Sequence, residues 1–417
     1  MAKLMSCLSS VAGAWRKTSL MLRIFIGIVI GAVLAVISPE LEGISILGDL
    51  FVGALKAVAP VLVFILVVSS VAKARTGLGP RFRKVVALYV LTTLSAAVLA
   101  VLASRIFPVS IALTDVSGVE NHAPGALGEV FRNILNGVMS NPVKAIIDAN
   151  YLSILFWAII IGLALKKYAG NATIDAIHDW SEAISLVVQW VIQCAPFGIM
   201  GLVFRSVSES GLEIFTTYGV LLLVLVGCML AVALIINPII VGIMLKRNPY
   251  PLFWKCLKES GVSAFFTRSS AANIPVNMEL CRRMGVDKDF YSVSIPLGST
   301  INMNGAAVTI TVMTLATCST IGIECSLASA LLLSIIATLA ACGASGVAGG
   351  SLLLIPMACS LFGISNDIAM QVVAVGFIIG VVQDSVETAL NSSGDAIFTI
   401  ATDMHERMKR GEELTNL

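Results

Sequence analysis

Long apolar runs are the feature that most constrains how this 417-residue chain can fold. An α-helix needs about 20 predominantly apolar residues to cross a bilayer. The chain is 57% hydrophobic and only 12% charged, whereas a soluble domain carries about 25% charged residues. A bilayer is therefore the expected solvent, and six spanning helices are predicted before residue 250. The apolar runs lie at residues 21–38, 47–72, 85–107, 151–166, 184–204 and 217–245.

Basic residues gather at alternate ends of these runs. The segment 73–84 is strongly basic, pairs of basic residues follow the fourth and sixth runs, and more close the chain, whereas the loop 108–150 is mainly acidic. The positive-inside rule then places both termini in the cytoplasm. The first run follows Arg16 and Lys17 and lacks a convincing small-residue cleavage site, so we interpret it as a retained helix and not as a signal peptide.

The pattern changes after residue 250. Two apolar segments are interrupted near their middles, by "TRSSAAN" (267–273) and by "CGASGVAGGS" (342–351), and neither arm of the first is long enough to span. Both are predicted to be re-entrant hairpins, which are tolerated in a membrane only where protein or a wet cavity surrounds them. Each precedes an apolar helix with a polar interruption, "STINMNG" (299–305) or "DSVETALNSSGD" (384–395). Two units of hairpin plus broken helix predict an internal repeat and a binding site near the membrane midplane.

The last helix carries a polar face. Asp384, Thr388, Asn391 and Asp395 are spaced four, three and four residues apart, which places them on one side of a helix. A carboxylate at membrane depth costs at least roughly 2.5–3.5 kcal/mol, so these acids need cations. The candidates are Arg268 in the first hairpin tip, a bound ion and a substrate ammonium.

Several chemistries have little support. The nine cysteines form no C-x-x-C pair, the three histidines form no cluster with them, and nucleotide-binding and hydrolase motifs are absent. A net charge of +2 does not suggest nucleic acid as a partner. The sequence favours a transporter, not an enzyme. Three alternatives stay open: a channel, a membrane enzyme that uses Asp384 and Asp395, and a carrier that is coupled to protons through Glu387.

The segments from "AFFTRSSAANIPVNM" (264–278) to "NSSGD" (391–395) resemble the dicarboxylate/amino acid:cation (sodium) symporter family, which includes the glutamate transporters. The resemblance covers essentially the whole chain and is strongest to the bacterial branch that carries serine and threonine with sodium. It implies eight transmembrane helices, two re-entrant hairpins and inverted repeats. It also implies a homotrimer whose transport domain moves like an elevator against a scaffold. The scaffold would lie within residues 1–250, and the transport core would comprise residues 251–417 with the third and sixth helices.

The resemblance also implies a set of binding residues. The substrate carboxylate would meet the first hairpin tip and Asn391, the ammonium would meet Asp384, and the second hairpin would close over the substrate. The implied substrate residues are Ser269, Ser270, Ala271, Met303, Ala306, Gly346, Val347, Ser351, Asp384, Glu387, Thr388 and Asn391. One sodium would take Gly298, Asn302, Asn391 and Asp395, and a second would take Thr300, Ala341, Cys342 and Ala344.

Three positions depart from the pattern of acidic-substrate members. Glu387 stands where those members carry an arginine, Ala306 replaces a threonine that contacts acidic substrates, and Asn304 replaces an aspartate at a third sodium site that keeps Tyr89, Thr92 and Thr93. A like charge at Glu387 would repel a second substrate carboxylate. The expected function is sodium-driven import of small neutral amino acids, serine and threonine, across the bacterial cytoplasmic (inner) membrane.

Overall fold

The computed structural model describes residues 18–73, 80–113, 139–342, 344 and 349–412, and each apolar run predicted in the first 250 residues is helical there. The helices are α2 (Leu20–Ile37), α3 (Ser45–Lys73), α4 (Pro80–Ile106), α7 (Tyr151–Tyr168), α8 (Asn171–Gln193), α9 (Ala195–Ser210), α10 (Ile214–Ala231) and α11 (Asn237–Leu245). A π-helical turn, Val232–Ile236, joins α10 to α11, and a 3-10 turn (Glu42–Ile44) and the short α6 (Pro142–Ile147) lie in connections.

Five helical segments of the described chain are long and apolar enough to cross a membrane, and the pair α8–α9, bent by 53°, makes a sixth. The α2 and α7 helices, with 18 residues each, are not among these six segments. The predicted total of eight spans is therefore confirmed only in part. Large apolar side chains such as Leu223 and Ile243 are each 73% exposed on α10 and α11. Exposed apolar surface on this scale fits a protein whose solvent is lipid, and the chain is a multi-pass membrane protein.

The second half contains helices on both sides of each predicted hairpin tip, although residues 343 and 345–348 of the second tip lie outside the described residues. The first runs through α12 (Tyr250–Cys256), a π-helical turn (Leu257–Gly261), α13 (Val262–Thr267) and α14 (Ile274–Arg283). The second runs from α17 (Leu327–Ala341) to a 3-10 turn (Leu352–Leu354) and α18 (Ile355–Ser360). Between them, α15 (Lys288–Ile301) and α16 (Asn304–Thr320) form one helix that is broken at Asn302 and Met303, as "NMNG" predicts.

The predicted second broken helix is wrong. The final helix α19 (Asn366–Lys409) is continuous over 44 residues, and "DSVETALNSSGD" lies inside it. Several of its hydroxyl groups bond to the helix itself: Ser385 donates to the Val381 carbonyl and Thr388 to the Asp384 carbonyl. The polar segment stays helical because these hydroxyl groups find hydrogen-bond acceptors on the intact helix backbone.

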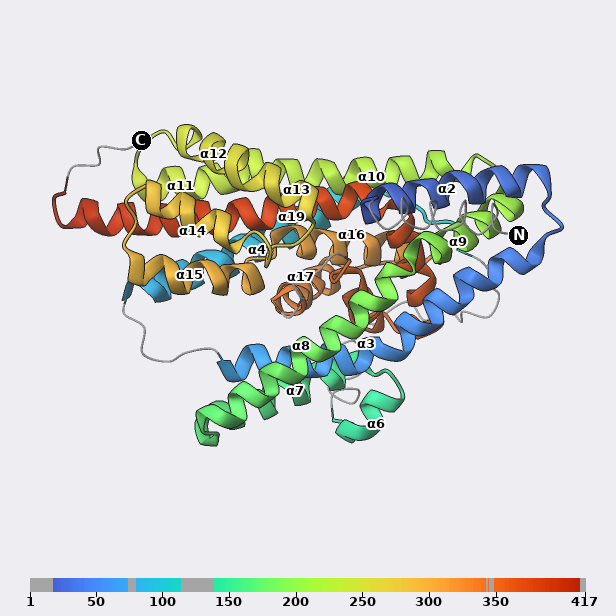
Figure 1. Ribbon diagram of the computed structural model, residues 1–417, viewed down its shortest axis with the longest axis horizontal. Coiled ribbons are helices and arrows are strands. Elements are labelled where there is room, and N and C mark those ends of the chain that lie inside the picture. Colours follow the sequence, from blue (N-terminus) through green and yellow to red (C-terminus); the bar gives the residue numbers. More distant parts are fainter. Residues whose placement is uncertain (1–17, 74–79, 114–138, 343, 345–348, 413–417) are drawn as a thin grey trace, which may run out of the picture.

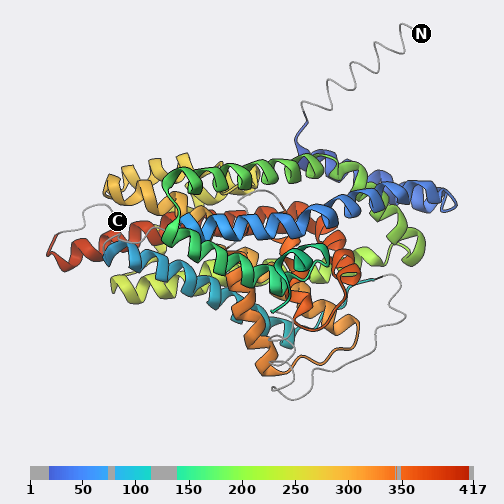
Figure 2. The same ribbon diagram turned by 90° about the horizontal axis from the view of Figure 1, so that it is seen from below.

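The α19 helix runs through the middle of the molecule in Figure 1, beside α10, α13 and α16, which it contacts. The α4 helix packs against α15, α16, α17 and α19, whereas α3 packs against α7, α8 and α9. Figure 2 shows the orange second hairpin beside the red α19. The third and sixth spanning helices, α4 and α10, thus pack on the C-terminal core.

Arg81 connects the start of α4 to this core. Its guanidinium lies 3.0 Å from Asp403 on α19 and 3.2 Å from Asp287, the residue that caps α15. The hydrogen bond from Arg81 holds the pKa of the Asp287 carboxyl below its usual value. Arg81 thus joins the start of α4 to α19 and to the start of α15.

Glycines let α2 and α9 approach closely. A β-carbon on Gly27 would overlap the carbonyl oxygen of Pro196, and one on Gly31 would overlap that of Met200. Backbone contact of this kind is typical of helix pairs in membranes, where small residues increase van der Waals packing.

Replacing Gly27 with alanine is expected to force α2 and α9 apart. Overpacking of this kind costs about 1–3 kcal/mol, so the apparent melting temperature of the purified protein in detergent should fall. Gly53→Ala is the matched control, because Gly53 is exposed on α3 and no atom lies within 4 Å of where its β-carbon would be. Equal melting temperatures for the two variants would contradict the close approach.

Candidate functional site

The break between α15 and α16 is stabilised by side chains from two other elements. In a continuous helix the Gly305 N–H would bond to the Ile301 carbonyl. Instead it donates to Oδ1 of Asn391 on α19, at 2.8 Å, and the Ile301 carbonyl accepts from the thiol of Cys342, at 3.4 Å. The last helix and the second hairpin thus replace hydrogen bonds that the break removes, as buried non-helical backbone requires.

The residues predicted for one cation lie together at this break. The Asn302 side-chain amide donates to the Asn391 carbonyl at 3.0 Å and to Oδ1 of Asp395 at 2.9 Å. Gly298 faces the same carboxylate: a β-carbon there would lie 2.9 Å from Asp395 Oδ1 and 2.9 Å from the Tyr89 hydroxyl. All of these residues are buried.

Two oxygens in this cluster have no partner among the described residues. They are Oδ1 of Asn302 and Oδ2 of Asp395, and both are fully buried. Unpaired buried acceptors are costly unless a donor or a cation meets them. A set of amide, carboxylate and carbonyl oxygens with no sulfur or imidazole ligand suits a hard cation such as sodium. Among the described residues, no group of three or more His, Cys, Asp or Glu side chains is arranged to hold a metal ion.

The second predicted cation set lies where the second hairpin meets the break. Cys342 contacts the Ile301 carbonyl, and the Ala344 N–H bonds to the Ala341 carbonyl at 2.9 Å. Ala341 and Ala344 are buried, whereas Thr300 is exposed and donates its hydroxyl to the Leu297 carbonyl. The structure thus brings the hairpin to the break and leaves Thr300 at its edge.

Asn304 forms a third polar cluster with α4. Its Oδ1 accepts from the hydroxyls of Thr92, at 3.2 Å, and Thr93, at 2.9 Å. Its Nδ2 is buried with no partner among the described residues. An amide therefore binds two neutral hydroxyls here, and the cluster has no carboxylate of its own.

Arg268 and Asp384 form a buried ion pair between the first hairpin tip and α19. Their Nε and Oδ2 atoms are 2.7 Å apart, and the two side chains are 10% and 5% exposed. The other oxygen of Asp384 accepts from the Gly349 N–H in the second hairpin, at 3.2 Å. Arg268 has a φ of 52°, an uncommon conformation for a residue other than glycine, at the end of α13. One carboxylate thus contacts both hairpins.

Glu387 lies one turn further along α19 and has no cationic partner in the described structure. Its Oε2 accepts from three neutral donors: the Thr309 hydroxyl at 2.7 Å, the Ser351 hydroxyl at 2.9 Å and the Gln383 amide at 2.6 Å. Gln383 and Thr309 were missed by the sequence analysis. Gln383 precedes Glu387 by four residues, and only this helical spacing could have suggested that the two side chains meet. Thr309 has no comparable spacing to Glu387 in the sequence.

The other predicted substrate residues surround these groups. Ser270, Met303, Ala306, Thr388 and Asn391 are buried, whereas Ala271 at the hairpin tip is exposed. Ser269 stabilises the tip, since its hydroxyl accepts from the Ala272 N–H at 3.2 Å. Gly346 and Val347 lie outside the described residues. Side chains from both hairpins, the broken helix and α19 thus meet in one buried polar region.

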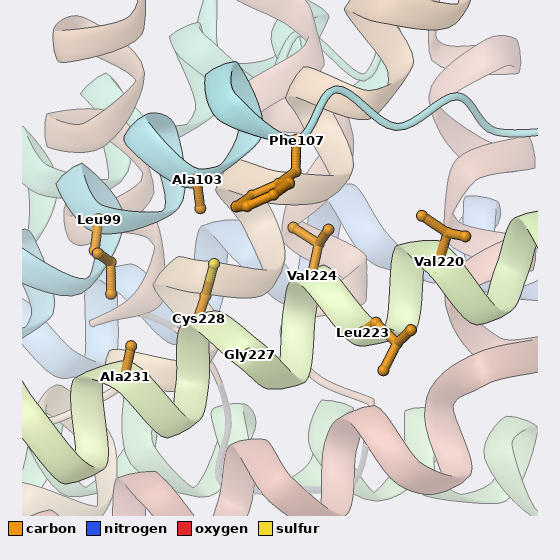
Figure 3. Close-up of a pocket in the computed structure, with 9 residues that line it drawn as sticks. All are labelled: Leu99, Ala103, Phe107, Val220, Leu223, Val224, Gly227, Cys228 and Ala231. Carbon is orange, nitrogen blue, oxygen red and sulfur yellow. The ribbon is translucent and has the colours of Figure 1, made fainter.

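An apolar pocket elsewhere does not suit a polar ligand. It has a volume of about 460 Å³ and lies between α4 and α10, as Figure 3 shows. It is lined by Leu99, Ala103, Phe107, Val220, Leu223, Val224, Gly227, Cys228 and Ala231. Since no charged or amide side chain faces it, we place the candidate site at the break and not there.

Comparison with known proteins identifies the family of the chain. The model of the sodium:dicarboxylate symporter family matches residues 20–404. The chain belongs to that family. The description is that of a symporter family, so the chain is a transporter and not an enzyme.

Similar proteins include three from bacteria, each described as "Serine/threonine transporter SstT". The protein from Bifidobacterium adolescentis is 55% identical over 414 residues, which cover 99% of this chain and 96% of that protein. That from Streptococcus agalactiae serotype III is 56% identical over 93% and 96% of the two chains. That from Enterococcus faecalis is 55% identical over 96% and 94%.

Filling the space beside Gly298 is expected to weaken sodium binding. In Gly298→Ala the new methyl group would lie against Asp395, and overpacking of about 1–3 kcal/mol corresponds to an increase of about tenfold in the sodium concentration needed for half-maximal transport. Gly380→Ala is the control, since Gly380 is buried in α19 with no atom within 4 Å of the added carbon. A sodium dependence that is the same in both variants would exclude Gly298 from the cation site.

Proposed function

We propose that this symporter imports serine and threonine together with sodium, by an elevator-type movement of a transport domain. Membership of a sodium symporter family and the three similar transporters support this proposal. The observation that carries the substrate choice is Glu387, a buried carboxyl group whose described partners are all neutral.

The α-amino and α-carboxylate groups of the substrate would bind on either side of Glu387. Asp384 would take the ammonium, because it is a buried acid that lies between the two hairpins. The side-chain N–H of Asn391 would donate a hydrogen bond to the carboxylate. In the structure this amide nitrogen lies 3.5 Å from the sulfur of Met303, which is a weak acceptor. Ser270 and Ala271 in the first hairpin tip would offer backbone N–H groups to the same carboxylate.

Glu387 makes the site unsuitable for acidic amino acids. A second substrate carboxylate would lie close to the carboxyl group of Glu387, which has no cationic partner in the described structure. Two like charges in a poorly solvated site repel strongly. A side chain that is small, neutral and able to donate a hydrogen bond has neither problem, and serine and threonine meet these conditions.

Sodium would bind at the break and compensate the remaining negative charge. Asp395 with Gly298, Asn302 and Asn391 would hold one ion, and the backbone near Thr300 with Ala341, Cys342 and Ala344 would hold a second. The two unpaired oxygens of Asn302 and Asp395 support the first of these sites. Asn304 with Thr92 and Thr93 would not hold a third ion in the same way, because that cluster has no carboxylate.

The larger assembly follows the family's arrangement in this proposal. The transport domain would comprise residues 251–417 with α4 and α10–α11, which pack on the core, and the scaffold would comprise α2, α3 and α7–α9. Three copies would assemble through their scaffolds in the bacterial inner membrane, with both termini in the cytoplasm.

Uptake by the purified protein in proteoliposomes tests this function. Labelled serine should accumulate only under an inward sodium gradient, saturate with concentration, and be inhibited by threonine but not by aspartate or glutamate. A proton gradient without sodium should drive no uptake. Strong inhibition by aspartate at neutral pH would refute the neutral-substrate proposal, and uptake that does not saturate would favour a channel.

A further inference from the structure

The three donors around Glu387 all bond to the same oxygen. Thr309, Ser351 and Gln383 donate to Oε2, and no described residue donates to Oε1. The side chains of Gln383 and Thr309 are fully buried. The Gln383 amide nitrogen also lies 2.7 Å from the Thr309 hydroxyl, so it joins α16 to α19 at this point.

A carboxylate is planar, so holding one oxygen from three directions also fixes the direction of the other. A carboxylate oxygen has about two lone-pair sites, so the three donors use the full capacity of Oε2, while the sites of Oε1 remain available. Oε1 of Glu387 is thus a fixed acceptor with unused capacity. Along α19, Glu387 lies between Asp384 and Asn391, the residues proposed for the substrate ammonium and carboxylate, and all three are buried.

We propose that Gln383 and Thr309 are positioning residues that hold Glu387 so that its Oε1 accepts the hydroxyl hydrogen of the substrate. This inference rests on the proposed function and deepens it: the site would select β-hydroxy amino acids over alanine and 2-aminobutyrate. Sites built to bond a substrate hydroxyl reject analogues without it strongly, because their polar groups are then left unpaired. Repulsion of acidic substrates by Glu387 does not predict this difference, since alanine is as neutral as serine.

The main alternative is that Gln383 only holds α16 against α19. A packing role would affect all substrates alike, whereas a positioning role would affect substrates with a hydroxyl group most. The ratio of the affinities for serine and alanine therefore separates the two roles, and total activity does not.

The experiment uses the full-length protein in proteoliposomes, with labelled serine competed by unlabelled serine, threonine, alanine and 2-aminobutyrate. Gln383→Met keeps the volume and removes the donor, and Thr309→Val removes a hydroxyl group. Thr309→Ser keeps the hydroxyl group and should show the same ratio of serine to alanine affinity as wild type. Thr317→Val is the matched control, because Thr317 is an equally buried threonine on α16 that donates to its own helix at the Met313 carbonyl.

We expect wild type to prefer serine over alanine, and we expect Gln383→Met and Thr309→Val to reduce that preference by about tenfold, mainly through serine. Thr317→Val should leave the ratio unchanged. An equal loss for serine and alanine, or no change in the ratio in either variant, would overturn the inference. If wild type took up neither serine nor threonine, the proposed function itself would fail; if it took up serine without preference over alanine, only this inference would fail.

Discussion

The side-chain amide of Asn302 bonds the broken helix to the last helix, and the candidate site depends on that connection. It bridges the Asn391 carbonyl and the Asp395 carboxylate, while the Asn391 side chain caps the start of α16 at Gly305. These two asparagines supply hydrogen bonds where the backbone leaves the helix inside the protein. Asn302 borders the proposed cation site, and Asn391 borders both that site and the proposed substrate site.

The buried acidic side chains of α19 create a need for positive charge in this region. Asp384, Glu387 and Asp395 lie within 12 residues of one another on α19, and Arg268 pairs with the first of them. Removing one partner from a buried ion pair costs about 3–5 kcal/mol, and an acid without a cation is similarly costly at membrane depth. In the proposed function, a co-transported cation and a substrate ammonium would supply positive charge. The same need explains why substrate and sodium would bind together, since each reduces the electrostatic cost of the other.

Much of this architecture could be predicted from the sequence, because apolar run length and helix-breaking residues act locally. The helical runs before residue 250 and the break at "NMNG" were predicted from such signals and are confirmed, whereas the two re-entrant hairpins stay a prediction. The prediction of a second helix break was wrong. The polar segment that suggested it remains helical, because its hydroxyl groups bond to carbonyls within α19. The partners of Glu387 could not be predicted: Thr309 and Ser351 are 78 and 36 residues away in sequence, and only the packing of α16 and the second hairpin brings them close.

In the proposed mechanism, sodium and substrate bind beside each other around Asn302 and Asn391. Equilibrium binding of labelled serine to the purified protein, with sodium replaced by choline at constant ionic strength, tests it most directly. Linkage between two sites typically changes affinity by about 5- to 150-fold. The account predicts that the dissociation constant for serine falls by a factor in this range as sodium is added. A dissociation constant that is the same with and without sodium would contradict it.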